Sequence, residues 1–165
     1  MRIVVAVLLG VIVATAGWLV TVMWLDLRDL RAADVSAAEA MVAAKAVAPD
    51  LLSYDYRTIE RDLARAATHT TGELAAQYKK LTTTLVAEAK AQKMVQTATV
   101  AGVAVERAEP DRVEVLLFVN TGTVKEIPGK ATPQQEINHN RARFVMVKQD
   151  SAWRVAGLST LLGTA

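Results

Sequence analysis

The sequence predicts an α+β protein with a membrane helix, a stalk helix and a small domain of about three helices and a curved four-stranded antiparallel sheet. Three observations support this prediction. Residues 3–25 form an uncharged run of apolar character. Residues 26–50 are rich in alanine, contain no glycine and have helical spacing of their apolar positions. After Met94 the pattern changes to the alternation that is typical of strands, in four successive runs.

The amino-terminal run has the length and composition of a transmembrane helix. Its residues would span roughly 35 Å as a helix, whereas the hydrocarbon core of a bilayer is about 30 Å thick. Thirteen of the residues from 3 to 25 are Ile, Leu or Val. A cleaved signal peptide is the alternative, but its apolar region usually has only about 7 to 15 residues. We therefore predict an uncleaved anchor over residues 1–25, with its amino terminus in the cytoplasm because Arg2 precedes the span.

The small residues of this anchor fall on one helical face, because they are spaced 4, 4, 3 and 4 positions apart. Such faces let two membrane helices approach closely and pack together. The sequence thus predicts a partner-binding face in the membrane, although small residues are also frequent in spanning helices in general. The face consists of Ala6, Gly10, Ala14, Gly17 and Thr21.

A stalk helix over residues 26–50 is predicted to follow, and it is either continuous with the anchor or separate from it. Pro49 is predicted to mark a joint, since the residue before a proline avoids the helical region. A new helix that begins there would carry Leu51 and Leu52 inward. The apolar positions with helical spacing are Leu27, Leu30, Ala37, Met41 and Ala44.

The remaining domain, residues 51–165, is predicted to begin with two helices. Asp55 is a candidate cap for a helix over residues 57–67. The sequence from Thr70 to Glu73 matches a capping box, which predicts that a long helix starts there. The predicted buried stripe of that helix consists of Leu74, Tyr78, Leu81, Leu85 and Ala89.

Four strands are predicted after these helices, joined in sequence order as an antiparallel meander that bends around a helix. The first two flank a turn at residues 109–112, and Gly102 is predicted to mark a β-bulge. Residues 125–135 form a predicted loop, and a turn at residues 150–151 separates the last two strands. One face of the second strand is predicted to carry Val113, Val115, Leu117 and Val119.

The composition excludes several kinds of chemistry. The chain has no cysteine, so disulfides, thiol catalysis and cysteine zinc sites are impossible. After residue 25 the net charge is only about +1 and no basic stripe is present, which argues against nucleic acid as a partner. Titratable residues that an active site would need are sparse, and they are His69, His139, Asp55, Glu73 and Tyr78.

These residues do not form a recognisable catalytic or metal-ligating pattern. The two histidines are far apart in the sequence, and no acidic cluster at ligand spacing accompanies them. We therefore expect no catalytic residue, no metal site and no cofactor. An apolar ligand pocket between the helices and the sheet remains an alternative function.

Several motifs in a fixed order resemble a known family. They are "LLSYDYRTIERDLARA", "TTGEL", "VEVLLFVN", "RARFVMVK" and "WRVAGL". Together they resemble the Mce-associated membrane proteins of actinobacteria, and the similarity extends over essentially the whole chain, anchor included. Its most specific positions, which we call the signature residues, are Tyr54, Asp55, Tyr56, Arg57, Thr71 and Gly72.

This resemblance implies an NTF2-like (cystatin-like) domain outside the cytoplasmic membrane, similar to that of VirB8-type secretion proteins. It also implies a non-catalytic accessory subunit that stabilises a mammalian-cell-entry (Mce) importer of fatty acids, sterols or other lipids. The expected partners are the permease or Mce subunits of that transporter, together with membrane lipids. The resemblance transfers no catalytic residue. A ligand-binding domain and a VirB8-like secretion scaffold are the alternatives.

Overall fold

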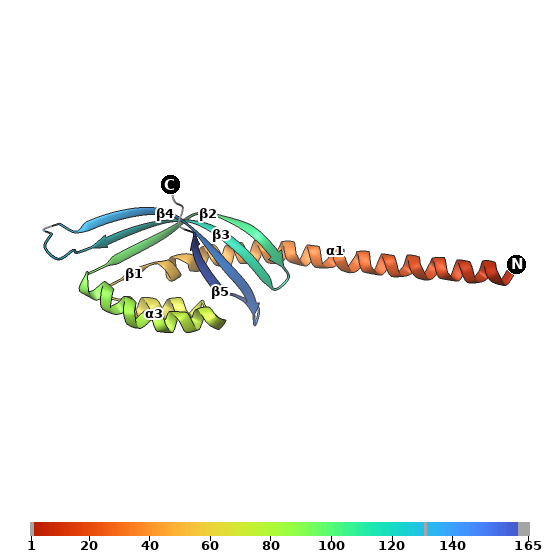
Figure 1. The fold of residues 1–165 in the computed structure, drawn as a ribbon, viewed down its shortest axis with the longest axis horizontal. Coiled ribbons are helices and arrows are strands. Elements are labelled where there is room, and N and C mark those ends of the chain that lie inside the picture. The colour runs from red at the N-terminus through yellow and green to blue at the C-terminus, as the bar shows by residue number, and fades with distance from the viewer. Residues whose placement is uncertain (1, 131, 162–165) are drawn as a thin grey trace.

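A computed structural model describes the backbone of residues 2–130 and 132–161, and their side chains except those of residues 2–14, 16, 26, 81 and 161. One long helix, α1, runs into a small domain, where a curved sheet covers the last part of this helix (Figure 1). Two shorter helices lie on the side of the domain away from the sheet. The order of elements is α1 (Arg2–Leu52), β1 (Tyr54–Asp55), α2 (Ile59–Thr68), α3 (Gly72–Ala91), β2 (Val95–Glu109), β3 (Arg112–Lys125), β4 (Gln134–Gln149) and β5 (Ala152–Leu161).

The predicted anchor and stalk form one continuous helix, α1, of 51 residues. The joint predicted at Pro49 is wrong, because Pro49 lies inside the helix. A proline this near the end removes only one intrahelical hydrogen bond, and its own carbonyl still accepts a bond from the Ser53 amide at 2.9 Å. Burial of the neighbouring Ala48 and Leu51 offsets that loss.

No helix within the described residues has both the length and the apolar character of a membrane span. The predicted span includes residues 3–14, whose side chains lie outside the described part of the structure.

The domain is built around the last third of α1, which lies against the sheet. The buried side of α1 differs from the apolar positions noted in the sequence. Of those positions only Ala44 is fully buried, whereas Leu30 is 64% exposed. Small side chains predominate on the buried side because they allow the helix axis to approach the strands closely. This stripe, the small-residue seam, consists of Ser36, Ala40, Ala44, Ala48 and Leu51.

The sheet is an antiparallel meander in the order β1-β2-β3-β4-β5, which confirms the predicted topology. It has five strands rather than the predicted four. The additional strand, β1, pairs Tyr54 with Gln96 and Asp55 with Val95. Two residues are too few to show an alternating pattern, so this strand had no sequence signal.

The predicted turns and bulge of the sheet are present. Glu109 pairs with Arg112 across the first hairpin. The register shifts between Val100 and Gly102, which confirms the bulge predicted at the glycine. Further register shifts lie between residues 105 and 107 and between 145 and 146. Bulges increase the local bend of a strand, and the bends let this sheet curve around α1.

The core lies between α1 and the inner face of the sheet. Val113, Val115, Leu117 and Val119 all point inward and are at most 2% exposed, as predicted. On β4 the matching residues are Ala142, Phe144 and Met146, and Val115 pairs directly with Phe144.

The caps of α2 and α3 differ from the predictions. Thr58, not Asp55, precedes α2, and the capping box before α3 is not formed. Instead Thr70 Oγ1 donates to the Ala67 carbonyl at 2.9 Å, and Glu73 accepts from Gln77. The physical reason lies outside the segment. The Thr71 amide bonds to the Val155 carbonyl at 2.9 Å, so β5 holds this connection in an extended form.

Gly72 opens α3 with a backbone φ of +59°, which an L-residue adopts only with strain. We expect Gly72→Ala to lower the free energy of unfolding by about 1 kcal/mol. A Cβ at this position would meet no atom within 4 Å, so the cost is conformational rather than steric.

Gly122→Ala is the matched control, because it also has open space but no positive φ. Urea denaturation should show no loss of stability for this control. Equal effects of the two substitutions would contradict the conformational explanation.

Candidate functional site

The signature residues 54–57 lie in the connection between α1 and α2. This connection is held by the buried carboxylate of Asp62. Asp62 Oδ2 accepts from the Thr58 hydroxyl at 2.7 Å and from the Asp55 amide at 3.2 Å. Arg65 donates to Oδ1 at 3.4 Å. These bonds join the start of α2 to β1 and fix the reversal of the chain after α1.

Two of the signature residues form a local ion pair on the surface. The Asp55 carboxylate accepts from the Arg57 amide at 2.9 Å and from the Arg57 guanidinium. These bonds lower the pKa of Asp55 to about 2. The same guanidinium lies 5.7 Å from the centre of the Tyr56 ring. This arrangement shapes a turn and keeps the Asp55 carboxylate ionised near neutral pH.

The aromatic and backbone groups of the signature residues bind to the end of α3. The Tyr54 hydroxyl donates to Met94 Sδ at 2.9 Å, and the Tyr56 amide donates to the Met94 carbonyl at 3.0 Å. Burial, together with the charge of Glu88, raises the pKa of Tyr54. The other two signature residues start α3, where Thr71 Oγ1 donates to Gln149 Oε1 at 2.9 Å.

The predicted membrane-helix face is only partly within the described structure. The side chains of Ala6, Gly10 and Ala14 lie outside the described residues. Gly17 and Thr21 are exposed, and the Thr21 hydroxyl donates to the Gly17 carbonyl at 2.9 Å. The face remains a prediction.

The titratable residues singled out in the sequence do not converge. His69 ends α2 and contacts Asp50 at 3.2 Å, whereas His139 on β4 contacts Asn120 at 2.7 Å. Among the described residues, Glu73 bonds to Gln77 along α3. Within the described part of the chain, no group of three His, Asp or Glu side chains is placed to hold a metal ion.

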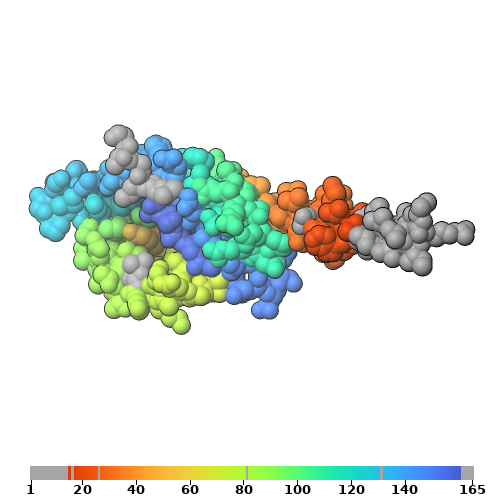
Figure 2. Space-filling view, turned by 45° about the vertical axis from the view of Figure 1, so that its right-hand side comes forward, coloured from red at the N-terminus to blue at the C-terminus, as the bar shows by residue number. Residues whose placement is uncertain are grey.

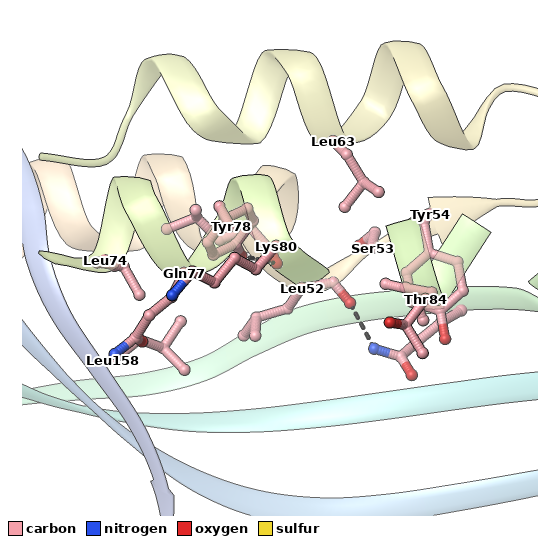
Figure 3. A pocket seen from close by; sticks show the side chains of 13 residues that line it. Leu52, Ser53, Tyr54, Leu63, Leu74, Gln77, Tyr78, Lys80, Thr84 and Leu158 are labelled. Carbon is pink, nitrogen blue, oxygen red and sulfur yellow. Dashed lines mark hydrogen bonds between the residues drawn. The ribbon is translucent and has the colours of Figure 1, made fainter. Parts of the chain in front are cut away.

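A cavity of about 610 Å³ lies between α3, the end of α1 and the sheet (Figure 3). Its size is within the range of small-molecule sites. Its walls come from six elements: α1, β1, α2, α3, β2 and β5. Most of the lining is leucine and tyrosine, and the full set is Leu51, Leu52, Ser53, Tyr54, Leu63, Leu74, Gln77, Tyr78, Lys80, Thr84, Leu85, Gln96 and Leu158.

The polar groups in the interior of this cavity already have protein partners. The Tyr78 hydroxyl donates to the Leu51 carbonyl at 2.7 Å, and Gln96 Nε2 donates to the Leu52 carbonyl at 2.7 Å. Ser53 Oγ accepts from the Ala98 amide at 2.9 Å. No buried side-chain nitrogen or oxygen in the described residues lacks a partner. The interior therefore presents a hydrocarbon surface.

The rim of the cavity on α3 is polar. Gln77, Lys80 and Thr84 lie on the side of α3 that faces the cavity, and all three are exposed. Among the described residues Lys80 has no carboxylate partner, whereas Lys90 on the same helix pairs with Glu60 at 2.7 Å. The sequence analysis missed these rim residues, because nothing in the local pattern distinguishes them from the solvated face of a helix.

Burial raises the pKa of Tyr78 to about 12, compared with a value of about 10 in an unfolded chain. A raised pKa means that the folded state binds the phenolic proton more tightly. This contribution to stability is complete below pH about 10 and is lost as the pH rises to about 12. We expect this contribution to the free energy of unfolding to be about 2 kcal/mol, because each tenfold change in proton affinity corresponds to about 1.4 kcal/mol.

Tyr78→Phe provides the comparison for this pH dependence. At pH 7 the variant should be less stable by about 1 kcal/mol, because the Leu51 carbonyl loses its donor. Urea unfolding of both proteins from pH 8 to 12 tests the expectation. The advantage of the wild type should disappear above pH about 10, and the Phe variant should become the more stable protein as the pH approaches 12, because the titration costs the wild type about 2 kcal/mol. A constant difference would contradict the expectation.

At the other end of the domain, three contacts fix α1 to the sheet. Ser36 Oγ donates to the Pro110 carbonyl at 2.5 Å, in the turn between β2 and β3. Glu39 accepts from Lys148 at 2.8 Å and from the Trp153 indole at 3.1 Å, and the hydrogen bond from Lys148 lowers the pKa of Glu39. Figure 2 shows α1 leaving the domain beside the β2–β3 hairpin. The helix and the domain thus meet in a defined orientation.

Comparisons with known sequences identify distant relatives in Mycobacterium tuberculosis. An uncharacterized protein is 32% identical over 137 residues, which cover 80% of this chain and 60% of that protein. A protein named as an outer membrane protein is 39% identical over 92 residues, which cover 55% of this chain and 58% of that protein. This chain therefore spans less than two thirds of either relative. No family model matches the chain.

Solved structures decide the fold. An IcmL-like type IV secretion system protein of Legionella pneumophila matches with a TM-score of 0.60 at 11% identity, over 78% of this chain and 94% of that one. An Ntf2-like protein involved in plasmid conjugation matches with a TM-score of 0.53 at 14% identity. The match covers 78% of this chain and 50% of that one. The chain has an NTF2-like fold. CagV, a VirB8 homolog of Helicobacter pylori, shares this NTF2-like fold with a TM-score of 0.56 at 9% identity. The match covers 74% of this chain and 96% of that one.

Proposed function

We propose that this protein is a non-catalytic accessory subunit of an Mce-type lipid import complex. In this proposal residues 1–25 anchor it in the cytoplasmic membrane with the amino terminus inside, and the NTF2-like domain lies outside. The anchor and the domain each bind subunits of the complex and so stabilise the assembly.

The observation that carries this proposal is the continuity of α1 from the predicted anchor into the core of the domain. Ser36 is the first residue of the small-residue seam, and it lies roughly 17 Å along the helix from Leu25, at about 1.5 Å per residue. The domain would therefore stand close to the membrane surface in a fixed orientation. A rigid connection of this kind suits a protein that positions other subunits.

The end of the predicted anchor also has the composition of a membrane interface. The Arg28 guanidinium lies 5.8 Å from the centre of the Trp24 ring. Tryptophan is enriched at the headgroup level, and an arginine beside it suits the polar side of that boundary. This pair supports the placement of the membrane surface just before the first domain contacts.

A VirB8-like secretion scaffold is the second candidate, and the structural comparisons favour it. Type IV secretion proteins share the NTF2-like fold with this chain. Sequence identities of 9% and 11% indicate a shared fold but not a shared function. The two functions are therefore distinguished by which proteins the chain binds. The family resemblance of the signature residues favours the Mce complex.

Purification of the tagged full chain from its own membrane tests the proposal. After cross-linking and mild detergent extraction, we expect the permease or Mce subunits to be recovered with it. Deletion of the gene should lower the amount of those subunits. Recovery of secretion-system subunits would support the second candidate, and recovery of the chain alone with unchanged transporter levels would contradict both.

The small-residue face of the anchor provides a specific test of the membrane contact. We expect Gly10→Leu with Gly17→Leu to reduce recovery of a membrane partner at least several-fold, since added side chains prevent close helix packing. Ile12→Phe with Leu19→Phe adds bulk to the opposite face and should leave recovery unchanged. Equal recovery from both double variants would contradict a role for this face.

A further inference from the structure

We propose that the cavity beside α3 binds a single-chain amphiphile of the fatty-acid class, with its alkyl chain among the leucines and its carboxylate at Lys80. This inference goes beyond the accessory role and does not depend on it. It rests on the lining of the cavity and on the charge at its rim.

The interior selects for a ligand without polar groups along its length. The hydroxyl of Tyr78, the amide of Gln96 and the hydroxyl of Ser53 are all engaged by backbone groups of the protein. A peptide segment placed there would bury amide groups that find no partner, which is costly. An alkyl chain carries no such groups and gains from burial against the leucine side chains.

The rim selects for an anionic head. Lys80 lines the rim of the cavity and has no carboxylate partner among the described residues, so its ammonium can bind the carboxylate of a ligand. The Thr84 hydroxyl, one turn further along α3, makes no hydrogen bond among the described residues and lies nearer to Tyr54, at the other end of the cavity (Figure 3). An apolar interior with a cation at its rim is the arrangement that a fatty acid requires.

The volume also suits one chain rather than a larger lipid. The cavity, at about 610 Å³, lies in the middle of the range that accommodates small ligands. The lining residues Leu63 on α2 and Leu74 on α3 are at most 7% exposed, whereas Lys80 and Thr84 are exposed. The ligand therefore enters along the exposed side of α3, where Lys80 and Thr84 lie.

A photoreactive probe tests the proposal on the full chain in phosphatidylcholine vesicles. The probe is a hexadecanoic acid that carries a diazirine in its chain. Because the bilayer competes for the alkyl chain, the informative measurement is the position of the label, determined by mass spectrometry of peptides. We expect adducts on residues 74–85 and on the peptide that contains Leu158, in addition to any on α1.

Two matched pairs of variants make the test specific. Thr84→Trp should block the mouth and reduce cavity labelling at least fivefold, whereas Thr83→Trp, on an exposed position outside the lining, should not. Lys80→Gln should raise the half-saturating probe concentration about twofold to fivefold, the range for an exposed ion pair. Lys79→Gln should have no effect, because Lys79 does not line the cavity.

Competition with unlabelled ligands tests whether binding requires the carboxylate head group. Unlabelled hexadecanoic acid should displace the probe from the cavity peptides, and its methyl ester should compete at least threefold less well. Absence of adducts on the cavity peptides would overturn the proposal. Equal labelling of the Thr84→Trp and Thr83→Trp proteins would also overturn it, as would equal competition by the acid and the ester. None of these results bears on the accessory role, which is tested by co-purification.

Discussion

Phe144→Ala is expected to lower the free energy of unfolding by about 3–5 kcal/mol, the largest effect of any single truncation considered for this domain. Phe144 is the largest fully buried side chain, with no exposed surface. It lies on β4 opposite Val115, at the centre of the inner face of the sheet. Truncation removes its apolar contacts and leaves a cavity that the curved sheet, held by α1, cannot close.

Phe118→Ala is the matched control, since Phe118 lies on the outer face of the sheet and is 44% exposed. We expect this variant to lose about 1 kcal/mol or less. Urea unfolding of the full chain in detergent, monitored by the circular dichroism signal of the sheet, measures the stability loss of both variants. Similar losses for the two variants would contradict a core between α1 and the inner face.

Ala44→Leu should have the second largest effect, a loss of about 1–3 kcal/mol in the free energy of unfolding. Ala44 belongs to the small-residue seam and has no exposed surface. A leucine there adds three carbon atoms where the helix packs closely against the sheet. The added volume must either displace α1 from the strands or force strained rotamers on its neighbours.

Ala46→Leu adds the same atoms two residues further along α1, on its exposed side. Alanine and leucine have similar helix propensities, so this control should change stability by less than about 0.5 kcal/mol. Unfolding in urea and limited proteolysis at the junction of α1 and the domain measure the difference. Equal stability of the two variants would show that α1 does not pack at the seam.

Both capping predictions were wrong because other parts of the chain hold these segments. Local rules assigned Asp55 and Thr70 as caps, but contacts with Asp62, seven residues after Asp55, and with Val155 on β5 hold these segments instead. The buried carboxylate of Asp62 binds the Asp55 amide, and the Val155 carbonyl binds the amide of Thr71. A backbone group that already has a tertiary partner does not need a side-chain cap.

The sequence by itself determined the order of α2, α3 and strands β2 to β5, the hairpin turns and the bulge at Gly102. These features depend on alternation, turn residues and glycine, all of which act within a few residues. The sequence also determined the inward face of β3. Successive side chains of a strand point to opposite faces, and on β3 one of these two faces is uniformly apolar.

Only the tertiary structure decided which side of α1 is buried and where the cavity lies. Alanine is nearly neutral in any pattern of hydrophobicity, so the small-residue seam becomes visible only when the sheet lies against it. The cavity combines residues from Leu51 to Leu158, and Lys80 has no special context in its own helix. Close approach and convergence depend on distances between segments that are remote in the chain, and no local pattern contains those distances.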